Sequence, residues 1–325
     1  MSNKITIIMP TYNAEEYIVR AIHSIIKQTY VNWELIIVDD GSVDSTIAII
    51  KEFLKKDRRI KLIKNMGKGA GAARNTGISN ANGDYLAFID SDDYYDIHYL
   101  EEANNYIIDG KDCIIFDYFV FYNNQKGNVR RVGTSPYNSF TACWNKVYKR
   151  ELWDGIRFDE TNKIEDLQVI PIIVNRAKNV CHASSDIYYY YYRDNNTSVT
   201  KTETAVEASK IIDAVNILIK RMKEENMDFN KDAAEFINQL VFPHLIMGIQ
   251  NSKNREEKRK IFLLIAPYLR KINSKLFNIK NNFYCKNRAK YIRTEIVIFL
   301  LNIRLYSLAF LFMKFSWYIG GRLRK

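Results

Sequence analysis

Apolar runs and amphipathic segments alternate along the first 90 residues, and this alternation constrains the fold more than any other feature. The runs are short, rich in β-branched residues and bounded by proline, glycine or aspartate, as buried strands are. Between them, apolar side chains recur at helical spacing and give one buried face. The order predicts a parallel sheet with helical crossovers, with strands at 4–10, 33–38, 60–63 and 85–89 and helices at 14–28 and 45–56. Asn13 is placed to cap the first helix.

Polar clusters follow four of the predicted strands. They are Pro10-Thr11-Tyr12, Asp39-Asp40, the glycine-rich segment 65–77 and Asp90-Ser91-Asp92. In parallel α/β sheets, ligands bind beyond the carboxyl ends of the strands, so all four clusters fall on the edge where a ligand is expected. The sequence therefore predicts one binding site assembled from these strand ends.

Three carboxylates crowd the end of the fourth strand. Asp90, Asp92 and Asp93 repel one another and raise each other's pKa unless a cation neutralises them. A hard divalent ion that takes one or two protein carboxylates, with phosphate and water as its other ligands, would do so. The alternative is a solvated acidic turn in which Asp93 or Asp96 caps the next helix.

Glycines at 67, 69 and 71 allow another group to approach the backbone closely. Arg74 is expected one turn into the helix that follows, where it can face a nucleotide or a sugar. Such glycine patterns also occur in dinucleotide-binding folds. In those folds the glycines follow the first strand, whereas here they follow the third. The sequence therefore favours a metal site at Asp90 and Asp92 over a dinucleotide-binding fold.

The middle of the chain offers further candidates. Residues 113–124 predict one strand, 124–133 an exposed turn or hairpin, and the five tyrosines at 188–192 another strand. Trp144 offers a flat apolar face for a sugar ring, or else it is a buried core residue. Glu165 and Asp166 precede an apolar segment, where capping of a helix is the simplest interpretation.

Four blocks carry a resemblance to a known family. IIMPTYNAEEYI, ELIIVDDGSVDST, GAGAARNTGISNANGDYLAFIDSDD and ACWNKVYKR occur in that order, and over residues 4–201 the chain resembles family 2 glycosyltransferases of the GT-A fold. The resemblance implies the bacterial cell-surface polysaccharide type, a nucleotide-sugar donor (most often a UDP-sugar), a metal site of the DxD type and inversion at the anomeric carbon. It also implies a glycan or lipid-linked acceptor.

The resemblance assigns roles to residues of this sequence. Tyr12 would stack on the base and the Asp40 carboxylate would accept the uracil N3–H, while Asp92 with Asp90 would hold Mn²⁺ or Mg²⁺. Of the acidic pair, Asp166 is favoured as the general base that deprotonates the acceptor hydroxyl, with Glu165 as the second choice. The remaining assignments are Pro10, Thr11, Arg74, Asp90 and Ser91 for the nucleotide, Trp144, Asn145 and Lys146 for the sugars, and Arg193 for the pyrophosphate.

The last part of the chain differs in character. We expect a catalytic domain at 1–202 and a helical region at 203–325, with helices near 203–225, 232–251 and 256–279. After residue 252 there are 18 Lys and Arg against three Asp and Glu, so the net charge of +11 belongs to the tail. Residues 291–319 are the most apolar in the chain, and a basic stripe runs along them. That combination predicts helices lying in a membrane interface, or else a C-terminal helix pair packed on the protein itself.

Composition narrows the protein class and the compartment. Hydrophobic content of 47% and charged content of 26% are typical of a globular protein. The four cysteines are scattered without a CxxC pair, and the N-terminus begins directly with a strand, so we expect the protein in the cytoplasm, at the inner face of the membrane.

A nucleotidyltransferase is the rival enzyme class, although no basic triphosphate loop is evident near the N-terminus. A nucleic-acid-binding protein is the rival outside enzymology, but the tyrosine run and the basic tail are far apart. The sequence leaves open whether the chain forms a homo-oligomer.

Overall fold

The structure is a computed structural model that describes residues 3–122, 125–161, 164–183, 188–192, 205–230, 232–237, 239–241 and 256. The chain divides into two compact units, residues 1–196 and 197–325. Each unit is described by itself.

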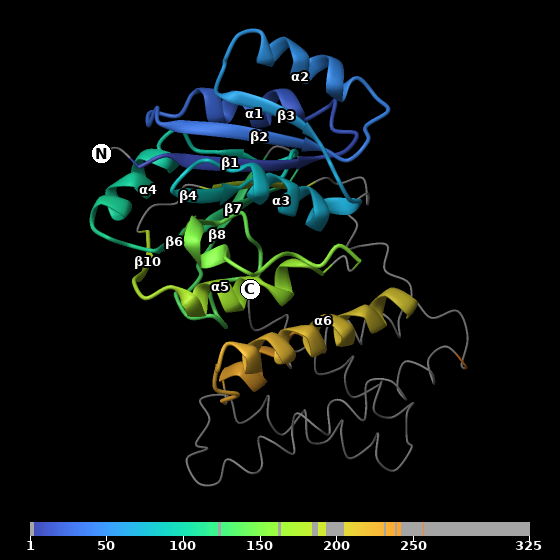
Figure 1. Ribbon diagram of the computed structural model, residues 1–325, viewed down its shortest axis with the longest axis vertical. Helices are drawn as coiled ribbons and strands as arrows, with labels where there is room; N and C mark the ends of the chain where they lie inside the picture. The colour runs from blue at the N-terminus through green and yellow to red at the C-terminus, as the bar shows by residue number, and fades with distance from the viewer. Residues whose placement is uncertain are drawn as a thin grey trace. The chain divides into compact units, whose positions relative to one another are not determined.

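A seven-stranded mixed sheet forms the centre of the first unit, and its order is β10-β6-β9-β4-β1-β2-β3 (Figure 1). All residues of β1, β2 and β4 are buried, because both faces of the sheet are covered. Within this sheet only β9 runs antiparallel to its neighbours. The parallel arrangement predicted for the first four strands is thus confirmed, and the antiparallel β9 makes the whole sheet mixed. The strands are β1 (Ile5–Thr11), β2 (Trp33–Asp39), β3 (Ile60–Lys64), β4 (Tyr85–Phe88), β6 (Cys113–Ile115), β9 (Lys146–Lys149) and β10 (Val180–His182).

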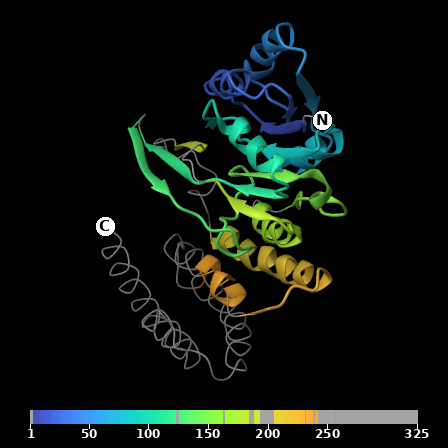
Figure 2. The same ribbon diagram turned by 90° about the vertical axis from the view of Figure 1, so that its left-hand side faces the viewer.

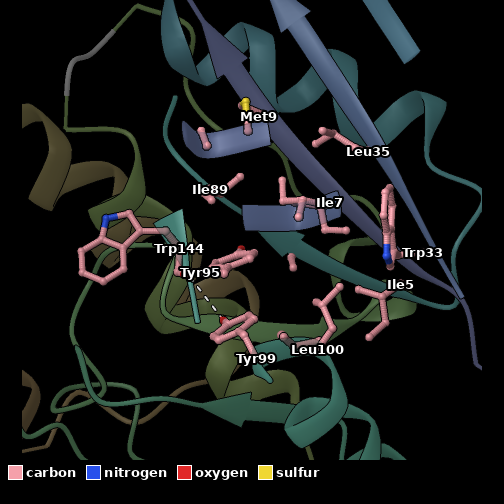
Figure 3. Packing of buried hydrophobic residues seen from close by; sticks show 14 of the residues in the cluster. Ile5, Ile7, Met9, Trp33, Leu35, Ile89, Tyr95, Tyr99, Leu100 and Trp144 are labelled. Atoms are coloured by element: carbon pink, nitrogen blue, oxygen red, sulfur yellow. Dashed lines mark hydrogen bonds between the residues drawn. The ribbon is translucent and has the colours of Figure 1, made fainter. Parts of the chain in front are cut away.

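Helices cover the two faces of this sheet in different ways. On one face, α1 (Ile18–Ile26), α2 (Thr46–Leu54) and α4 (Tyr99–Ile108) bury their apolar sides in one large core. Figure 3 shows residues of this core, among them Ile5, Ile7 and Met9 of β1, Tyr95 just before α4, and Tyr99 and Leu100 at the start of α4. On the other face, α3 (Gly69–Asn80) packs on Ile36 and Val38 of β2 through its small residues. The remaining helical pieces of this unit are η1 (Arg150–Trp153), η2 (Asp166–Gln168) and α5 (Ile170–Arg176).

A second sheet of four strands has the order β5-β11-β7-β8 and projects from the first (Figure 2). Its strands are β5 (Tyr94–Tyr95), β11 (Tyr188–Tyr192), β7 (Tyr118–Tyr122) and β8 (Gln125–Arg130). The predicted strand at 188–192 is confirmed. The stretch 124–133, predicted as an exposed turn or hairpin, instead contains the strand β8, which forms a hairpin with β7. The single strand predicted at 113–124 is wrong, because the chain leaves one sheet at Phe116 and enters the other at Tyr118. Asp117 fixes this crossing: its buried carboxylate accepts hydrogen bonds from Arg131, the Val132 N–H and His182.

Two local predictions about helix caps are also wrong. Asn13 has φ +44° and does not cap α1, because its Oδ1 accepts the Val43 N–H at 2.9 Å and the helix begins only at Ile18. The N-cap position of α4 is His98, and no side chain makes the capping hydrogen bond there. Asp96 Oδ1 instead accepts the His98 N–H at 3.0 Å, in the turn just before the helix. Asp96 thus orders the turn that leads into α4, whereas Asp90 and Asp92 lie before this turn and do not cap the helix.

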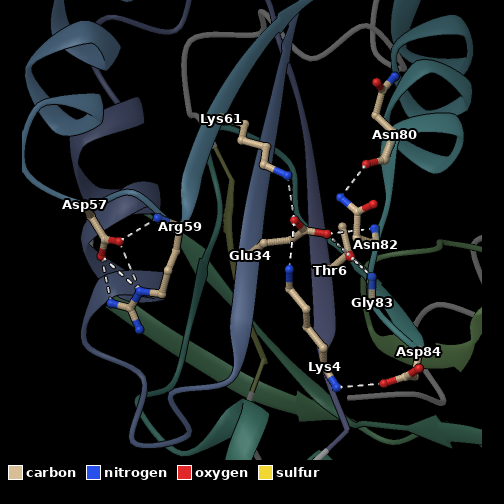
Figure 4. Close-up of polar contacts among 10 residues, drawn as sticks. All are labelled: Lys4, Thr6, Glu34, Asp57, Arg59, Lys61, Asn80, Asn82, Gly83 and Asp84. Carbon is tan, nitrogen blue, oxygen red and sulfur yellow. Dashed lines mark hydrogen bonds and ion pairs between the residues drawn. The ribbon is translucent and has the colours of Figure 1, made fainter.

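A buried carboxylate lies at the opposite edge of the sheet from the predicted site. Glu34, near the start of β2, accepts hydrogen bonds from Lys4 at 3.1 Å and Lys61 at 2.9 Å (Figure 4). Thr6 Oγ1 and the Asn82 N–H donate to its other oxygen, each at 2.8 Å. Burial alone would raise the pKa of Glu34, but these four donors lower it to about 2. We call these residues the Glu34 cluster.

In the second unit the structure describes α6 (Ala205–Glu224), which coincides with the helix predicted near 203–225. Among the described residues, no helix is both long enough and apolar enough to cross a membrane. The apolar stretch 291–319 and its basic stripe lie outside the described residues.

Candidate active site

The carboxyl ends of β1, β2, β3 and β4 lie at one edge of the sheet, as predicted. The Asp40 N–H donates to the Thr11 carbonyl at 2.9 Å, and the Asn65 N–H donates to the Asp39 carbonyl at 2.8 Å. These bonds extend the pairing of the strands by one residue and fix the loops that follow. The polar clusters found in the sequence therefore begin from a rigid base.

Of the two neighbouring aspartates, Asp39 closes the turn after β2 and Asp40 faces the glycine-rich segment. Asp39 accepts the Gly41 N–H at 3.0 Å and the Ser42 hydroxyl at 2.5 Å. Asp40 accepts Asn65 Nδ2 at 2.6 Å and the Gly69 N–H at 2.8 Å. An ionised carboxylate has about four lone-pair sites, so Asp40 retains capacity for a ligand donor. Asn65 was missed in the sequence, although its place directly after β3 was a usable signal.

The residues at the end of β1 divide by exposure. Pro10 and Thr11 are buried strand residues, paired in register with Val38 and Asp39. The Tyr12 side chain, in contrast, is 58% exposed. Only Tyr12 of these three therefore presents a side chain on which a base can stack, whereas Pro10 and Thr11 shape the floor beneath it.

The glycine-rich segment is mostly helix and not an open loop, since α3 begins at Gly69. A Cβ on Gly71 would lie 2.5 Å from the Asp159 carbonyl oxygen and 3.4 Å from Glu165 Cγ. Gly69 has φ +87°, a conformation that side chains other than hydrogen rarely adopt. The predicted close approach is therefore real, but at Gly71 the approaching group is the protein's own segment before Asp166.

Arg74 is the centre of the site. Its buried guanidinium donates from Nη1 to Glu165 Oε1 at 2.6 Å and from Nη2 to Asp90 Oδ1 at 2.9 Å. Nη1 also lies 3.6 Å from Asp166 Oδ1. One buried cation thus connects the strand end that carries Asp90 with the segment that carries the acidic pair. We call these four residues the Arg74 cluster.

Three carboxylates around one cation leave this cluster with excess negative charge. Burial raises the pKa of Glu165 to about 7, and Arg74 only partly opposes that effect. Burial also raises the pKa of Asp166, with the Asp90 charge acting in the same direction. Burial disfavours the charged form of Arg74, yet the surrounding acidic groups raise its pKa well above the ordinary value. Burial and the crowding of charge therefore favour the protonated forms of Glu165 and Asp166 more than in water.

The two members of the acidic pair differ in their contacts. Glu165 is 8% exposed and its carboxylate is committed to Arg74. Asp166 has a side chain 22% exposed, and its Oδ2 accepts the Cys143 N–H at 3.2 Å. Asp166 Oδ1 is buried without a hydrogen-bond partner. Neither residue caps a helix through its side chain. Asp166 is therefore the more exposed member of the pair, and Glu165 is the member that is hydrogen-bonded to Arg74.

Asp90, Ser91 and Asp92 are half-buried after β4, whereas Asp93 is fully buried. In the part of the chain that the structure describes, no three His, Cys, Asp or Glu side chains converge as a metal site. Asp90 binds Arg74 through Oδ1 only, and 30% of its side chain is exposed. These residues fit a Mg²⁺ or Mn²⁺ ion that takes one or two carboxylates and completes its shell with ligand phosphate and water.

The sugar-binding role predicted for Trp144, Asn145 and Lys146 conflicts with their burial. Trp144 is 6% exposed and packs edge-on against Tyr118, with ring centroids 4.8 Å apart. Lys146 is fully buried, and its Nζ donates to Asn145 Oδ1 and to the carbonyls of residues 140 and 142 at 2.7–2.9 Å. Burial lowers the pKa of Lys146 to about 8. These residues are therefore core residues that fix the loop before β9, and the alternative of a buried tryptophan holds. Arg193, predicted to hold the pyrophosphate, lies outside the described residues.

Comparison with known proteins places the chain among glycosyltransferases. Residues 6–171 match the model of the family described as Glycosyl transferase family 2. Glycosyltransferase GlyA of Streptococcus pneumoniae is 30% identical over 259 residues, which are 73% of this chain and 37% of GlyA. An Escherichia coli protein, UDP-Glc:alpha-D-GlcNAc-diphosphoundecaprenol beta-1,3-glucosyltransferase WfgD, is 42% identical over 121 residues, which are 37% of this chain and 47% of WfgD. The chain thus spans less than half the length of both relatives.

Among solved structures, S. aureus TarS 1-349 in complex with UDP-GlcNAc superposes with a TM-score of 0.71. The match covers 98% of this chain and 92% of that chain at 18% sequence identity. At this identity the likeness shows a shared fold, and it confirms the GT-A fold that the sequence predicted.

Proposed function

The chain belongs to glycosyl transferase family 2, and from that membership we propose that it transfers a sugar from a nucleotide-diphosphate sugar to an acceptor hydroxyl with inversion. One observation carries the proposal. The buried Arg74 binds Asp90, on the proposed donor side of the site, and its Nη1 lies 2.6 Å from Glu165 and 3.6 Å from Asp166. One arginine thus joins the carboxylate proposed for the donor side to the pair proposed to contain the proton acceptor, at the edge where ligands of α/β sheets bind.

We propose a UDP-sugar as the donor. Tyr12 would stack on the base, and Asp40 would accept the uracil N3–H through a lone pair that Asn65 and Gly69 leave available. The known relatives support this choice, since the TarS structure is a complex with UDP-GlcNAc and WfgD is named for UDP-Glc.

Asp92 and Asp90 would hold Mg²⁺ or Mn²⁺ next to the donor diphosphate. The ion would neutralise charge on the leaving nucleoside diphosphate. Asp166 would take the proton of the acceptor hydroxyl as its oxygen attacks the anomeric carbon in line. One bond from that carbon to the new oxygen forms while its bond to the diphosphate oxygen breaks. The products are an inverted glycoside and a nucleoside diphosphate.

Calorimetry of UDP binding tests the donor and metal assignments together. UDP should bind more tightly with Mn²⁺ than in EDTA, and Asp92→Asn should remove that difference. Equal binding of the unaltered protein in the two buffers would rule out the metal site. A screen of nucleotide sugars for turnover then identifies the donor. Release of pyrophosphate instead of a nucleoside diphosphate would favour the nucleotidyltransferase alternative.

We also propose that the acceptor is a cell-surface glycan or its lipid-linked precursor and that the protein binds the cytoplasmic face of the membrane through its tail. Support comes from the excess of 18 basic over three acidic residues after residue 252, beside the apolar stretch 291–319. Each basic group near an anionic leaflet contributes about 1 kcal/mol of binding free energy, and an inserted apolar face adds a part that salt does not weaken.

Full-length protein should sediment with anionic vesicles and be only partly released by salt. Arg304→Glu with Lys314→Glu should reduce sedimentation, and a protein that ignores vesicles would contradict the proposal.

A further inference from the structure

Taking the proposed function as its premise, we infer that Glu165 is a positioning residue that holds Arg74 away from the base Asp166. The distances show the asymmetry. Arg74 Nη1 lies 2.6 Å from Glu165 Oε1 but 3.6 Å from Asp166 Oδ1. The second Arg74 nitrogen, Nη2, is committed to Asp90. Glu165 therefore captures the one guanidinium nitrogen that otherwise lies within reach of the base.

This arrangement leaves Asp166 Oδ1, which is buried, without a hydrogen bond. Hydrogen bonds between arginine and a carboxylate are strong, so a guanidinium placed directly on Asp166 would occupy a lone pair and stabilise the ionised form. A base held in that way accepts a proton less readily. By binding Arg74 at a shorter distance, Glu165 keeps the guanidinium close enough to attract the Asp166 charge without a direct hydrogen bond.

Helix α3 carries Arg74 and also fixes the segment before Glu165. Asn75 Nδ2 donates to the Phe158 carbonyl and Asn75 Oδ1 accepts the Phe158 N–H, each at 2.9 Å. Gly71 leaves just enough room for the Asp159 carbonyl and for Glu165. The position of Glu165 relative to Arg74 is therefore set by one helix, as a positioning function requires.

Steady-state kinetics of four variants test the inference: Glu165→Ala, Glu165→Gln, Arg74→Gln and the double variant Glu165→Ala with Arg74→Gln. Glu165→Ala should lower kcat roughly 10–100-fold, the scale for a small misplacement of a catalytic group, with little change in KM for the nucleotide sugar. Glu165→Gln keeps an acceptor oxygen for Arg74 and should lose less. Arg74→Gln should lower activity in the unaltered protein but raise kcat when Glu165 is already alanine, because the competing guanidinium is gone.

Glu160→Ala is the matched control, because this carboxylate lies on the same segment and accepts Asn75 Nδ2 at 3.1 Å, with no contact to Arg74. It should show no coupling to Arg74→Gln. Additive losses for Glu165→Ala and Arg74→Gln, or a loss in Glu165→Ala as complete as in Asp166→Asn, would overturn the inference.

A crystal structure of Glu165→Ala, or of Glu165→Gln if alanine prevents folding, supplies a readout that needs no activity. In the alanine variant Arg74 Nη1 should move to hydrogen-bond distance from Asp166 Oδ1. In the glutamine variant it should stay on residue 165. An Arg74 that remains fixed in the alanine variant would refute the positioning role. If the unaltered protein transfers no sugar, the proposed function fails, while the crystal structure still decides where Arg74 goes.

Discussion

The Glu34 cluster and the Arg74 cluster have opposite charge arrangements: the first places cations around an anion, and the second places anions around a cation. At the amino ends of the strands, one buried carboxylate is shared by two lysines and receives four hydrogen bonds. At the carboxyl ends, one buried arginine is shared by three carboxylates, and Asp166 Oδ1 receives no hydrogen bond. The Glu34 cluster lies on β1, β2, β3 and the segments beside them, whereas the Arg74 cluster joins α3, the end of β4 and the start of η2. In the first cluster cations outnumber the carboxylate, and in the second carboxylates outnumber the cation.

This difference predicts that the Glu34 cluster stabilises the fold and that the Arg74 cluster takes part in the reaction. Satisfied hydrogen bonds to a buried charge stabilise a fold, and the pKa of Glu34, lowered to about 2, reports that. Buried and crowded carboxylates cost stability but have raised pKa values: burial raises the pKa of Glu165 to about 7, and the Asp166 charge acts in the same direction. We therefore expect substitutions in the Arg74 cluster to change rates and those in the Glu34 cluster to change the free energy of unfolding.

The largest expected effect is that of Asp166→Asn. Removing the proton acceptor should lower the transfer rate by roughly 10²–10⁴-fold, the usual scale for a general base, while UDP binding is retained. Because the substitution also removes one of three crowded negative charges, the thermal midpoint should stay the same or rise. Transfer assays and thermal unfolding of the same preparation check both parts. A variant that unfolds much more readily would show that the Arg74 cluster is structural after all.

Gly71→Ala tests how tightly the base segment is held against α3. A Cβ 2.5 Å from the Asp159 carbonyl must displace that segment, and a shift near 1 Å in a catalytic group can cost about 10²-fold in rate. We expect a loss of that order in kcat. Ala72→Gly, at the neighbouring position, is the control, because it adds no atom. A Gly71→Ala enzyme with normal kcat would mean that the segment accommodates the methyl group without moving Asp166.

Much of this architecture was readable in the sequence. Strand periodicity predicted β1 to β4, and the topology rule for α/β sheets predicted that Tyr12, Asp40 and Asp90 would share an edge. These signals are local in sequence or follow from strand order. The prediction also separated Asp166 from Glu165, although only the contacts with Arg74 give that preference a physical basis.

What the sequence did not reveal depends on distant partners. Arg74 and Glu165 are 91 residues apart, and no local pattern pairs them. Trp144, Asn145 and Lys146 looked like ligand-binding residues because their side chains are aromatic or polar. Their burial depends on Tyr118 and on carbonyl groups that only the folded chain brings near. The break at Asp117 was missed because a single charge in an apolar run does not reveal that Arg131 and His182 will meet it.

Glu34→Gln should have the opposite profile to Asp166→Asn. Loss of charge-assisted hydrogen bonds at a buried site should lower the free energy of unfolding by about 1–3 kcal/mol, with transfer kinetics unchanged. Because the pKa of Glu34 is lowered on folding, its stabilising effect is present above the ordinary value of 4.5 and is lost as pH falls toward about 2. Denaturant unfolding at pH 7 and pH 3 should therefore show a smaller difference between variant and unaltered protein at pH 3. If the difference in unfolding free energy is the same at both pH values, the altered shape of the side chain, and not the loss of its charge, causes the loss of stability.

The smallest expected effects come from the lysines of the Glu34 cluster taken singly. Lys4 and Lys61 have side chains 35% and 44% exposed, so each ion pair is partly screened by solvent. Lys4→Met or Lys61→Met alone should cost about 0.2–1 kcal/mol of unfolding free energy, because the other lysine still neutralises Glu34. The double variant should cost more than the sum, since it leaves a buried carboxylate with no cation, and a coupling of roughly 0.5–3 kcal/mol is typical for residues in one network. Denaturant unfolding of the four proteins measures this coupling. If the two losses simply add, the lysines do not share Glu34 in the way the contacts indicate. The contrast with an arginine shared by three carboxylates would then rest on the Arg74 cluster alone.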